Sequence, residues 1–166
     1  MAHINVSSSG SIEFLGKKYK VALGKNGVTE YKKEGDEATP VGCMPIREIF
    51  YRSDKIQKPD TMLPINALHE TDGWCDDPED PNYNKLVRLP YKAGHEKLWR
   101  DDDLYDIIVI LGYNDDPPKS GKGSAIFMHI ARDNYSPTAG CIALSLKDLI
   151  EILKKANKET HVCVNK

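Results

Sequence analysis

The sequence lacks any apolar run long enough to cross a membrane. None of its 166 residues lies in a stretch that approaches the roughly 20 apolar residues of a membrane-spanning helix. The opening segment, residues 1–7, has no charged region followed by an apolar one, so we expect no secretory signal there. Three explanations of this start stay open: the mature protein begins here, a signal has been trimmed, or export uses another route.

An excess of charge of one sign is also missing. The chain has 23 lysines and arginines against 25 aspartates and glutamates, which gives a net charge of −2. So small a net charge exerts no general electrostatic attraction on nucleic acid or on anionic lipid. We therefore expect no nucleic-acid partner and no membrane-spanning segment, and function must lie in local groups of residues.

Cysteine is scarce, and the four cysteines stand far apart, at positions 43, 75, 141 and 163. So few cysteines cannot form a disulfide-dense scaffold in a chain of this length. The sequence has no CxxC pair and no close Cys/His cluster, so we expect no structural zinc site. We expect Cys43 and Cys163 to be buried, small apolar residues. A disulfide between these two stays open, as does the redox state of Cys75.

The length predicts a single domain over residues 1–166, and the apolar pattern predicts a mainly β fold. Short apolar runs at 11–15, 19–23 and 46–51 indicate strands. The middle of the chain, about 53–103, is rich in proline and shows little periodicity. Long loops of this kind are often functional. We expect an irregular insertion that packs on its own aromatic side chains and walls a cleft.

The last third of the chain contains the clearest elements. A continuous β-branched run at 105–111 predicts a buried central strand, and 123–130 predicts the next strand. Ser145 and Asp148 form a capping box, so we expect the one principal helix to begin there. Residues 161–164 are expected to form a final strand.

Cys141 is the most informative residue of the chain. It stands twelve residues after His129 and opens the apolar run 142–144, whereas His129 closes the run 124–128. A cysteine attacks as its thiolate, and a nearby histidine can take the thiol proton. If the two runs are strands, the pair lies at one sheet edge and the loop 130–140 frames a cleft. The pattern favours a cysteine acyl-transfer enzyme, although this spacing alone also fits a buried thiol and a strand-end histidine.

Several neighbours of this pair are candidates for the same site. Gly140 lets a carbonyl group approach the sulfur, and its backbone N–H is expected in an oxyanion region. Thr138 is expected to hydrogen-bond within the loop or to substrate. Tyr113 and Asn114 follow the central strand and are expected to line the cleft, with turn formation as the alternative. His95 and Glu96 form a second polar pair, for which a helix start is the alternative.

The segment 129–144 resembles the active-site signature of L,D-transpeptidases of the YkuD family. That signature has a histidine at a strand end, a variable loop, then Ser/Thr-x-Gly-Cys and an apolar residue, as in Thr138-x-Gly140-Cys141. Other stretches resemble a bacterial branch of the family, in the same order along the chain, whose members often lack an obvious signal peptide. They are residues 73–78, 83–84, 89–91, 95–100 and 123–127, whereas 33–36 and 39–42 resemble the stretch of the family in which a Thr-Pro-x-Gly element precedes a strand.

The resemblance implies a YkuD-type β-sandwich with its helix after Cys141, acting on peptidoglycan tetrapeptide stems. Cys141 would attack the carbonyl of the third residue, and His129 would serve as base and then as acid for the departing D-alanine. The thioester would pass to an amine of another stem, to a free D-amino acid or to water. No metal or cofactor is implied, and carbapenems are expected to acylate Cys141. The expected place is the cell envelope or periplasm; a cytoplasmic place or non-standard export stays open.

Two departures from the family pattern stand next to the nucleophile. Ala139 replaces a common histidine or lysine, and Ala143 replaces a common arginine. Arg132 is the expected replacement for binding a substrate carboxylate, because arginine forms bidentate pairs; a solvated surface charge is the alternative. Transfer and hydrolysis therefore both stay open, and an inactive peptidoglycan-binding module is a further alternative.

Overall fold

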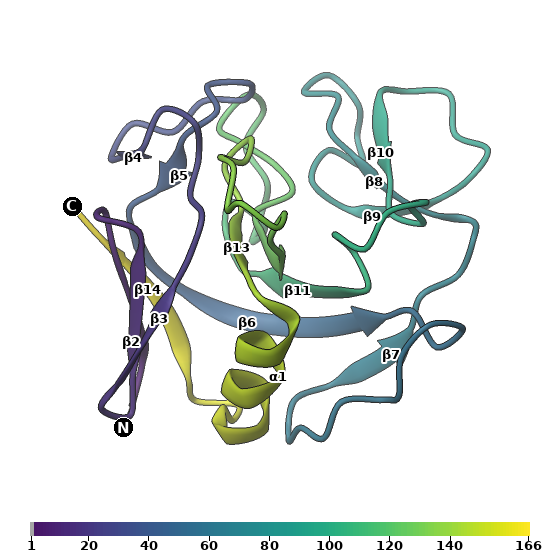
Figure 1. The fold of residues 1–166 in the computed structure, drawn as a ribbon. Helices are drawn as coiled ribbons and strands as arrows, with labels where there is room; N and C mark the ends of the chain where they lie inside the picture. The colour runs from purple at the N-terminus through teal and green to yellow at the C-terminus, as the bar shows by residue number, and fades with distance from the viewer. Residues whose placement is uncertain (1) are drawn as a thin grey trace.

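The computed structural model describes residues 2–166 and shows a mainly β fold built on one large sheet (Figure 1). Its nine strands follow the order β13, β12, β11, β6, β14, β1, β2, β3, and β7 pairs with β6 outside this path. The bounds are β1 Ile4–Ser7, β2 Ser11–Phe14, β3 Lys17–Lys20, β6 Gly42–Tyr51, β7 Ile65–Ala67, β11 Ile107–Leu111, β12 Phe127–Ile130, β13 Ile142–Leu144 and β14 His161–Asn165.

Backbone hydrogen bonds join the two ends of this sheet and nearly close it. After β3, Ala22 donates its N–H to Ala143 at 2.7 Å and accepts the Ala143 N–H at 2.9 Å. Beside them, Thr138 donates to the Leu23 carbonyl at 3.0 Å and accepts the Lys25 N–H at 2.9 Å. The loop that precedes β13 is therefore fastened to the N-terminal part of the chain.

The ten-residue strand β6 connects the two halves of the sheet. Its first part pairs with β14, where Cys43 lies opposite Cys163, and its second part pairs with β11, where Ile49 lies opposite Val109. The sequence predicts only the second part, 46–51. A glycine and a proline interrupt the apolar pattern of the first part, and both residues weaken a strand signal.

Hydrophobic residues fill both faces of the sheet. Ile107 and Val109 of β11 belong to the larger cluster of buried side chains, and Ile108 and Ile110 belong to a smaller cluster. Because successive side chains of a strand point to opposite faces, the two clusters lie on opposite sides of β11. A strand covered on both faces reads as a continuous apolar run. The smaller cluster also includes Cys141, so the thiol belongs to the core on that side.

The predicted helix is present as α1, Leu146–Lys155. Ser145 caps it by accepting the Asp148 N–H at 3.1 Å, as the capping box predicts. Its buried residues Leu149 and Ile152 join the larger cluster, so the helix covers that face of the sheet (Figure 1). No helix within residues 2–166 has the length and apolar character to cross a bilayer.

The segment 53–103 is largely irregular, as predicted, but it contains short strands that the sequence analysis missed. Three of them form a separate small sheet in the order β10, β8, β9, seen beside the main sheet in Figure 1. Strands of three or four residues are too short for alternation to stand out in a sequence. The bounds are β8 Asp72–Cys75, β9 Leu86–Arg88 and β10 His95–Lys97, and for the separate pair, β4 Val28–Thr29 and β5 Thr39–Pro40.

Strand β12 begins later than the sequence predicts, at Phe127 instead of position 123. Gly123 has a φ of +113° and Ala125 has a φ of +54°. Positive φ values lie outside the β region, so the chain cannot enter the strand before these residues. The irregular approach brings the Ala125 carbonyl to the thiol described below.

Cys43 and Cys163 form a disulfide, so the expectation of two buried free cysteines is wrong. They lie directly opposite each other on the antiparallel strands β6 and β14, with their Cα atoms 3.9 Å apart. Cys163 is buried, but Cys43 is exposed. The pairing depends on strand register across 120 residues, which no local pattern reveals. Cys75 and Cys141 are free and buried.

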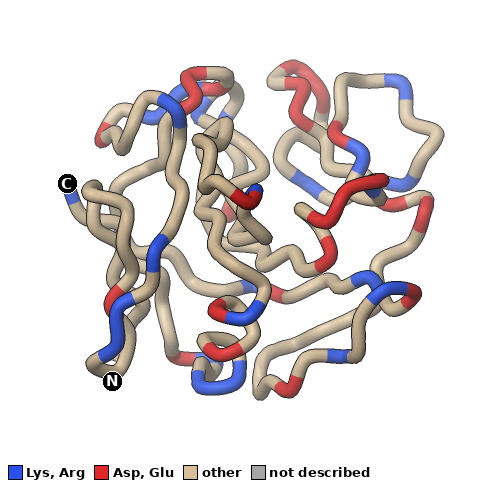
Figure 2. The backbone as a smooth tube through the Cα atoms, in the orientation of Figure 1, with Lys and Arg blue, Asp and Glu red and all other residues tan. Residues whose placement is uncertain are grey.

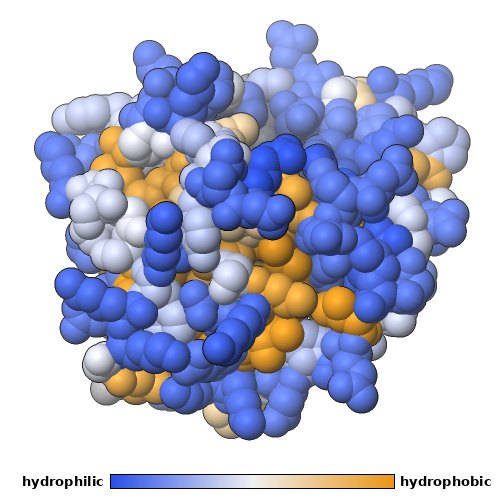
Figure 3. All heavy atoms as spheres, viewed as in Figure 1, coloured by the Kyte–Doolittle hydropathy of each residue, from blue (hydrophilic) through white to orange (hydrophobic). Residues whose placement is uncertain are grey.

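The surface carries both signs of charge. Figure 2 shows basic and acidic residues interspersed along the loops, in agreement with the net charge of −2. Neither sign is confined to one part of the chain trace. Figure 3 shows that the same face is mainly hydrophilic, with hydrophobic residues in a band through its middle, over the region of β13 and α1.

Candidate active site

Cys141 and His129 project from the same face of two neighbouring parallel strands. His129 lies in β12, opposite Ala143 of β13. Cys141 directly precedes β13 and lies beside Phe127, so by alternation its side chain shares the face of His129, two positions away. Both side chains line one cleft of about 530 Å³. The two side chains therefore share one face of the sheet and one cleft.

The Cys141 thiol is buried and hydrogen-bonded to the backbone that leads into β12. It donates to the Ala125 carbonyl at 3.2 Å and accepts the Phe127 N–H at 3.4 Å. Burial raises the pKa of Cys141 to about 12. The charge of Glu96 acts in the same direction, whereas the Phe127 N–H and the Lys32 ammonium oppose it. The sulfur therefore keeps its proton at neutral pH.

His129 is buried, and its neutral form carries the proton on Nδ1. That N–H donates to the Ile130 carbonyl at 2.9 Å; since a carbonyl only accepts, Nε2 is left with its lone pair. Burial lowers the pKa of His129 to about 4, and the positive charges of Arg100 and Arg132 act in the same direction. The Tyr105 ring meets the imidazole edge-on, with centroids 5.2 Å apart. At neutral pH, Nε2 therefore carries no proton.

Thr138 and Gly140 shape the turn before the thiol. The Thr138 hydroxyl donates to the Cys141 carbonyl at 2.7 Å and accepts the Gly140 N–H at 3.1 Å. Gly140 has a φ of +135°, and a Cβ at this position would stand 2.9 Å from the Ala38 carbonyl oxygen. Only glycine fits there. The Gly140 N–H, expected in the oxyanion region, is thus bonded within the loop in this conformation, and Thr138 both stabilises the loop and lines the cleft.

The structure separates the other three predicted binding residues. Arg132 is exposed and lines the cleft. Tyr113 and Asn114 do not line it, contrary to the expectation. Their side chains hydrogen-bond instead to backbone groups of residues 119–123, at 2.8 to 3.1 Å. They hold the loop after β11 in shape, which is the turn chemistry named as their alternative.

The insertion supplies one wall of the cleft. His95 and Glu96 lie on the short strand β10 and not at a helix start. Arg100 is held by Asp102 through two hydrogen bonds at 2.8 and 2.7 Å, and this pairing lowers the pKa of Asp102 to about 2. The insertion side chains that line the cleft are Asp76, His95, Glu96, Arg100.

Two carboxyl groups of the cleft, those of Glu34 and Glu96, each accept a hydrogen bond from a tyrosine, and the sequence analysis identified neither of these contacts. Glu34 accepts hydrogen bonds from the Tyr83 hydroxyl at 2.6 Å and from the Ser124 hydroxyl at 2.7 Å. Glu96 accepts the Tyr105 hydroxyl, although burial and neighbouring carboxylates raise the pKa of Glu96. The partners of Glu34 lie 49 and 90 residues away, so only the fold brings them together.

The cleft combines a thiol, an imidazole and charged side chains of both signs. Its cations are Lys32, Arg100 and Arg132, and its carboxylates include Glu34 and Glu96. Within residues 2–166, no group of three or more histidine, cysteine, aspartate or glutamate side chains is arranged to hold a metal ion. A thiol beside an unprotonated imidazole nitrogen is suited to acyl transfer through a covalent intermediate.

Comparison with known proteins adds the family. The YkuD family, described as L,D-transpeptidase catalytic domain, matches residues 11–164. Two solved structures of the helical cell shape determining protein Pgp2 from Campylobacter jejuni are similar at a TM-score of 0.41: one at 16% identity and a K307A mutant at 17%. Each match covers 99% of this chain and 47% of the other, so the chain spans about half the length of these structures. No curated protein matches the sequence. Because the family match extends over nearly the whole chain, the chain belongs to the YkuD family of L,D-transpeptidase catalytic domains.

Proposed function

We propose that this chain is a peptidoglycan L,D-transpeptidase in which Cys141 is the nucleophile and His129 the general base. The family acts on peptidoglycan, which supports the class of substrate. The observation that carries the proposal is the placement of a thiol and an unprotonated imidazole nitrogen on one sheet face, in one cleft. The proposed substrate is a tetrapeptide stem, cleaved between its third residue and its terminal D-alanine.

The acylation step uses both side chains in turn. The thiol releases Ala125, its proton passes to Nε2 of His129, and the sulfur forms a bond to the carbonyl carbon of the third residue. The C–N bond to D-alanine then breaks, and the imidazolium returns the proton to the leaving amine. A thioester on Cys141 remains. His129 stays fixed in orientation throughout, because Nδ1 is bonded to the Ile130 carbonyl.

The second step decides the class of reaction. An amine of another stem would give a 3–3 cross-link, a free D-amino acid would give exchange, and water would give carboxypeptidase activity. In each case Nε2 takes a proton from the attacking group, and the thiolate leaves. We propose transfer to an amine as the main reaction, with hydrolysis as the competing outcome.

We propose that Arg132 binds a carboxylate of the stem. Its side chain is exposed at the cleft that contains Cys141, and its planar guanidinium is suited to bidentate carboxylate binding. Neither Ala139 nor Ala143, next to the nucleophile, offers a charge for this task. We propose further that residues 53–103 act as the wall of the substrate cleft within one catalytic domain.

We propose the cell envelope, and specifically the periplasm, as the place of action. YkuD proteins are usually associated with the envelope. The disulfide Cys43–Cys163 supports a compartment outside the reducing cytosol, because disulfides persist mainly in oxidising environments.

The test is incubation with purified disaccharide-tetrapeptides, followed by mass spectrometry of the products. Cross-linked dimers are expected for the unaltered protein, and added D-methionine is expected to replace terminal D-alanine. Tripeptides alone would make it a carboxypeptidase. A carbapenem is expected to acylate Cys141 and to give a stable adduct, seen as an increase in the mass of the protein.

The matched controls are the two buried free cysteines. Cys141→Ala is expected to abolish turnover and carbapenem addition, whereas Cys75→Ala, which lies outside the cleft, is expected to retain both. Unchanged turnover by Cys141→Ala would overturn the proposal. Binding to sacculi without any turnover by the unaltered protein would instead make the domain a peptidoglycan-binding module.

A further inference from the structure

Lys32 places a buried ammonium group beside the loop of the nucleophile. The residue is 8% exposed and lines the same cleft as Cys141. A Cβ added to Gly140 would stand 3.4 Å from Lys32 Nζ. The ammonium group therefore lies next to Gly140, the residue that directly precedes Cys141. A buried lysine is rare unless it is paired, so the burial of Lys32 requires a partner that compensates the loss of hydration of its ammonium group.

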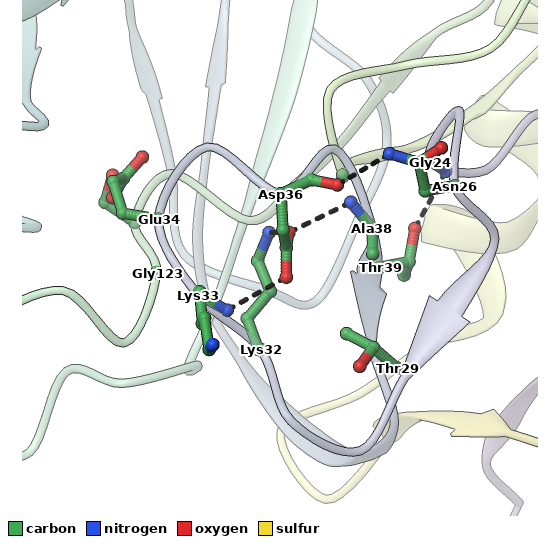
Figure 4. A network of polar contacts seen from close by, with 12 residues as sticks. Gly24, Asn26, Thr29, Lys32, Lys33, Glu34, Asp36, Ala38, Thr39 and Gly123 are labelled. Atoms are coloured by element: carbon green, nitrogen blue, oxygen red, sulfur yellow. Dashed lines mark hydrogen bonds and ion pairs between the residues drawn. The ribbon is translucent and has the colours of Figure 1, made fainter.

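Asp36 holds this ammonium in place. Its carboxylate forms an ion pair with Lys32 Nζ and also accepts the backbone N–H groups of Lys33 at 2.9 Å and Ala38 at 3.0 Å (Figure 4). Burial alone would raise the pKa of Asp36, but Lys32 and the two N–H groups bring that pKa below its ordinary value. The Asp36 carboxyl group is therefore negatively charged at neutral pH.

The surrounding chain leaves room for Lys32 and keeps its partner fixed. A Cβ on Gly123 would stand 3.0 Å from Lys32 Cγ and 3.1 Å from its Cε. The absence of a side chain at Gly123 therefore leaves room for the aliphatic part of Lys32. The Asn26 side chain donates to the backbone carbonyl of Asp36 at 2.9 Å. Residue 25, next to it, is bonded to Thr138 in the nucleophile loop. The ion pair and the nucleophile loop are thus parts of one connected structure.

The groups that face Cys141 make this cation important. Glu96 faces the thiol from β10, with a carboxyl group whose pKa is raised by burial, and Tyr105 and His129 are the other neighbours of the thiol. When the thiol loses its proton, a negative charge forms in a buried region, where charges interact more strongly than in water. Lys32 is the buried cation that opposes this charge.

We propose that the Lys32–Asp36 pair is an electrostatic positioning device of the active site, whose ammonium stabilises the negative charge that forms on Cys141 Sγ. In that step the S–H bond breaks, the proton goes to His129 Nε2, and the electron pair stays on sulfur. Lys32 keeps all its protons and forms no covalent bond. The inference rests on the proposed role of Cys141 as nucleophile, but not on the identity of the peptide or of the acyl acceptor.

The test is the rate at which iodoacetamide alkylates Cys141, followed by peptide mass mapping over a pH series. The thiolate displaces iodide, so the rate reports the thiolate whether or not peptidoglycan is turned over. Lys32→Met removes the charge and keeps the length; it is expected to slow alkylation about tenfold at a given pH and to displace the rate–pH profile to higher pH. Lys32→Arg is expected to stay within about threefold of the unaltered protein, since it keeps the charge.

Lys33→Met is the matched control, because Lys33 is exposed and does not line the cleft; it is expected to leave the rate unchanged. Unfolding cannot imitate the expected result, since an unfolded cysteine has a lower pKa than the buried one and alkylates faster. Equal rates for Lys32→Met and the unaltered protein would overturn the proposal. A loss seen only with the anionic reagent iodoacetate would also overturn it, and would make Lys32 a carboxylate-binding residue.

Discussion

The thiol of Cys141 donates its hydrogen to the carbonyl oxygen of Ala125, 3.2 Å away, and not to His129. His129 in turn donates its Nδ1–H to the Ile130 carbonyl. The proposed nucleophile and base are therefore each bonded to the backbone of the same strand region. Proton transfer between them requires the thiol to leave Ala125, while the imidazole already presents Nε2.

His129→Gln is expected to lower the rate of D-alanine release by about 10²- to 10⁴-fold, because general-base assistance is lost. Release can be followed by mass spectrometry of tetrapeptide substrates. The matched control is His161→Gln, on β14 and outside the cleft, which is expected to retain activity. Similar losses in both variants would point to a general folding defect and contradict the role of His129.

The stability of the fold is expected to depend on pH through His129. Burial lowers its pKa from 6.5 in the unfolded chain to about 4 in the folded one, so between these values only the unfolded chain binds the proton. The contribution of the neutral imidazole to the free energy of unfolding is fully present above about pH 6.5. It is lost as the pH falls through about 4, and the total loss is about 3 kcal/mol. The free energies of unfolding of the unaltered protein and of His129→Gln, measured in urea, should approach each other as the pH falls through this window, because only the unaltered protein loses this contribution. Parallel pH curves would show that the buried imidazole does not titrate as proposed.

Loss of the disulfide is expected to destabilise the fold without changing the residues that line the cleft. Cys43 and Cys163 are 120 residues apart, so their bond closes a long loop and restricts the unfolded chain. Reduction, or the double variant Cys43→Ser with Cys163→Ser, is expected to cost about 2–4 kcal/mol and to lower the Tm by on the order of 10 °C. Thermal melts with and without dithiothreitol measure this. The reductant should have no effect on the double variant, and a full response there would exclude this bond as the cause.

Gly140→Ala is expected to disturb the nucleophile loop. The new Cβ would stand 2.9 Å from the Ala38 carbonyl oxygen at a φ of +135°, which costs about 2–3 kcal/mol and displaces Cys141. Gly121→Ala is the control, because Gly121 has a φ of +76° with nothing within 4 Å; about 1 kcal/mol is expected. Denaturant unfolding and D-alanine release compare the two. Equal costs would mean that the contact with Ala38 relaxes freely.

Arg132→Gln is expected to raise the KM for tetrapeptide stems about tenfold, because a charge-assisted contact to a carboxylate is lost. Its Tm should stay unchanged, since the side chain is exposed. Arg88→Gln, an exposed arginine on β9 outside the cleft, is the control. Steady-state kinetics of both variants measure the effect; an unchanged KM for Arg132→Gln would leave Arg132 as a solvated surface charge.

Elements with local causes were predictable from the sequence. The helix after Ser145 follows from its cap to Asp148, three residues away, and the central strand follows from a continuous apolar run. The presence of Cys141 and His129 in one cleft was also foreseen, because each residue stands at the end of an apolar run; their catalytic roles stay a prediction. Tyr113 and Asn114 were misplaced, since a position after a strand does not decide whether a side chain enters a cleft or closes a turn.

The amino-acid sequence is sufficient for the class of fold, for the principal helix and for naming Cys141 and His129 as the candidate nucleophile and base, because these depend on residues within a few positions of one another or on one contiguous motif. The disulfide partner of Cys43, the tyrosine that donates to Glu34 and the position of Lys32 next to Gly140 depend on the tertiary structure. Each joins segments that are distant in the chain, and only strand register and the near closure of the sheet bring those segments into contact. Local patterns contain no information on that contact, because it is produced by burial of the whole core.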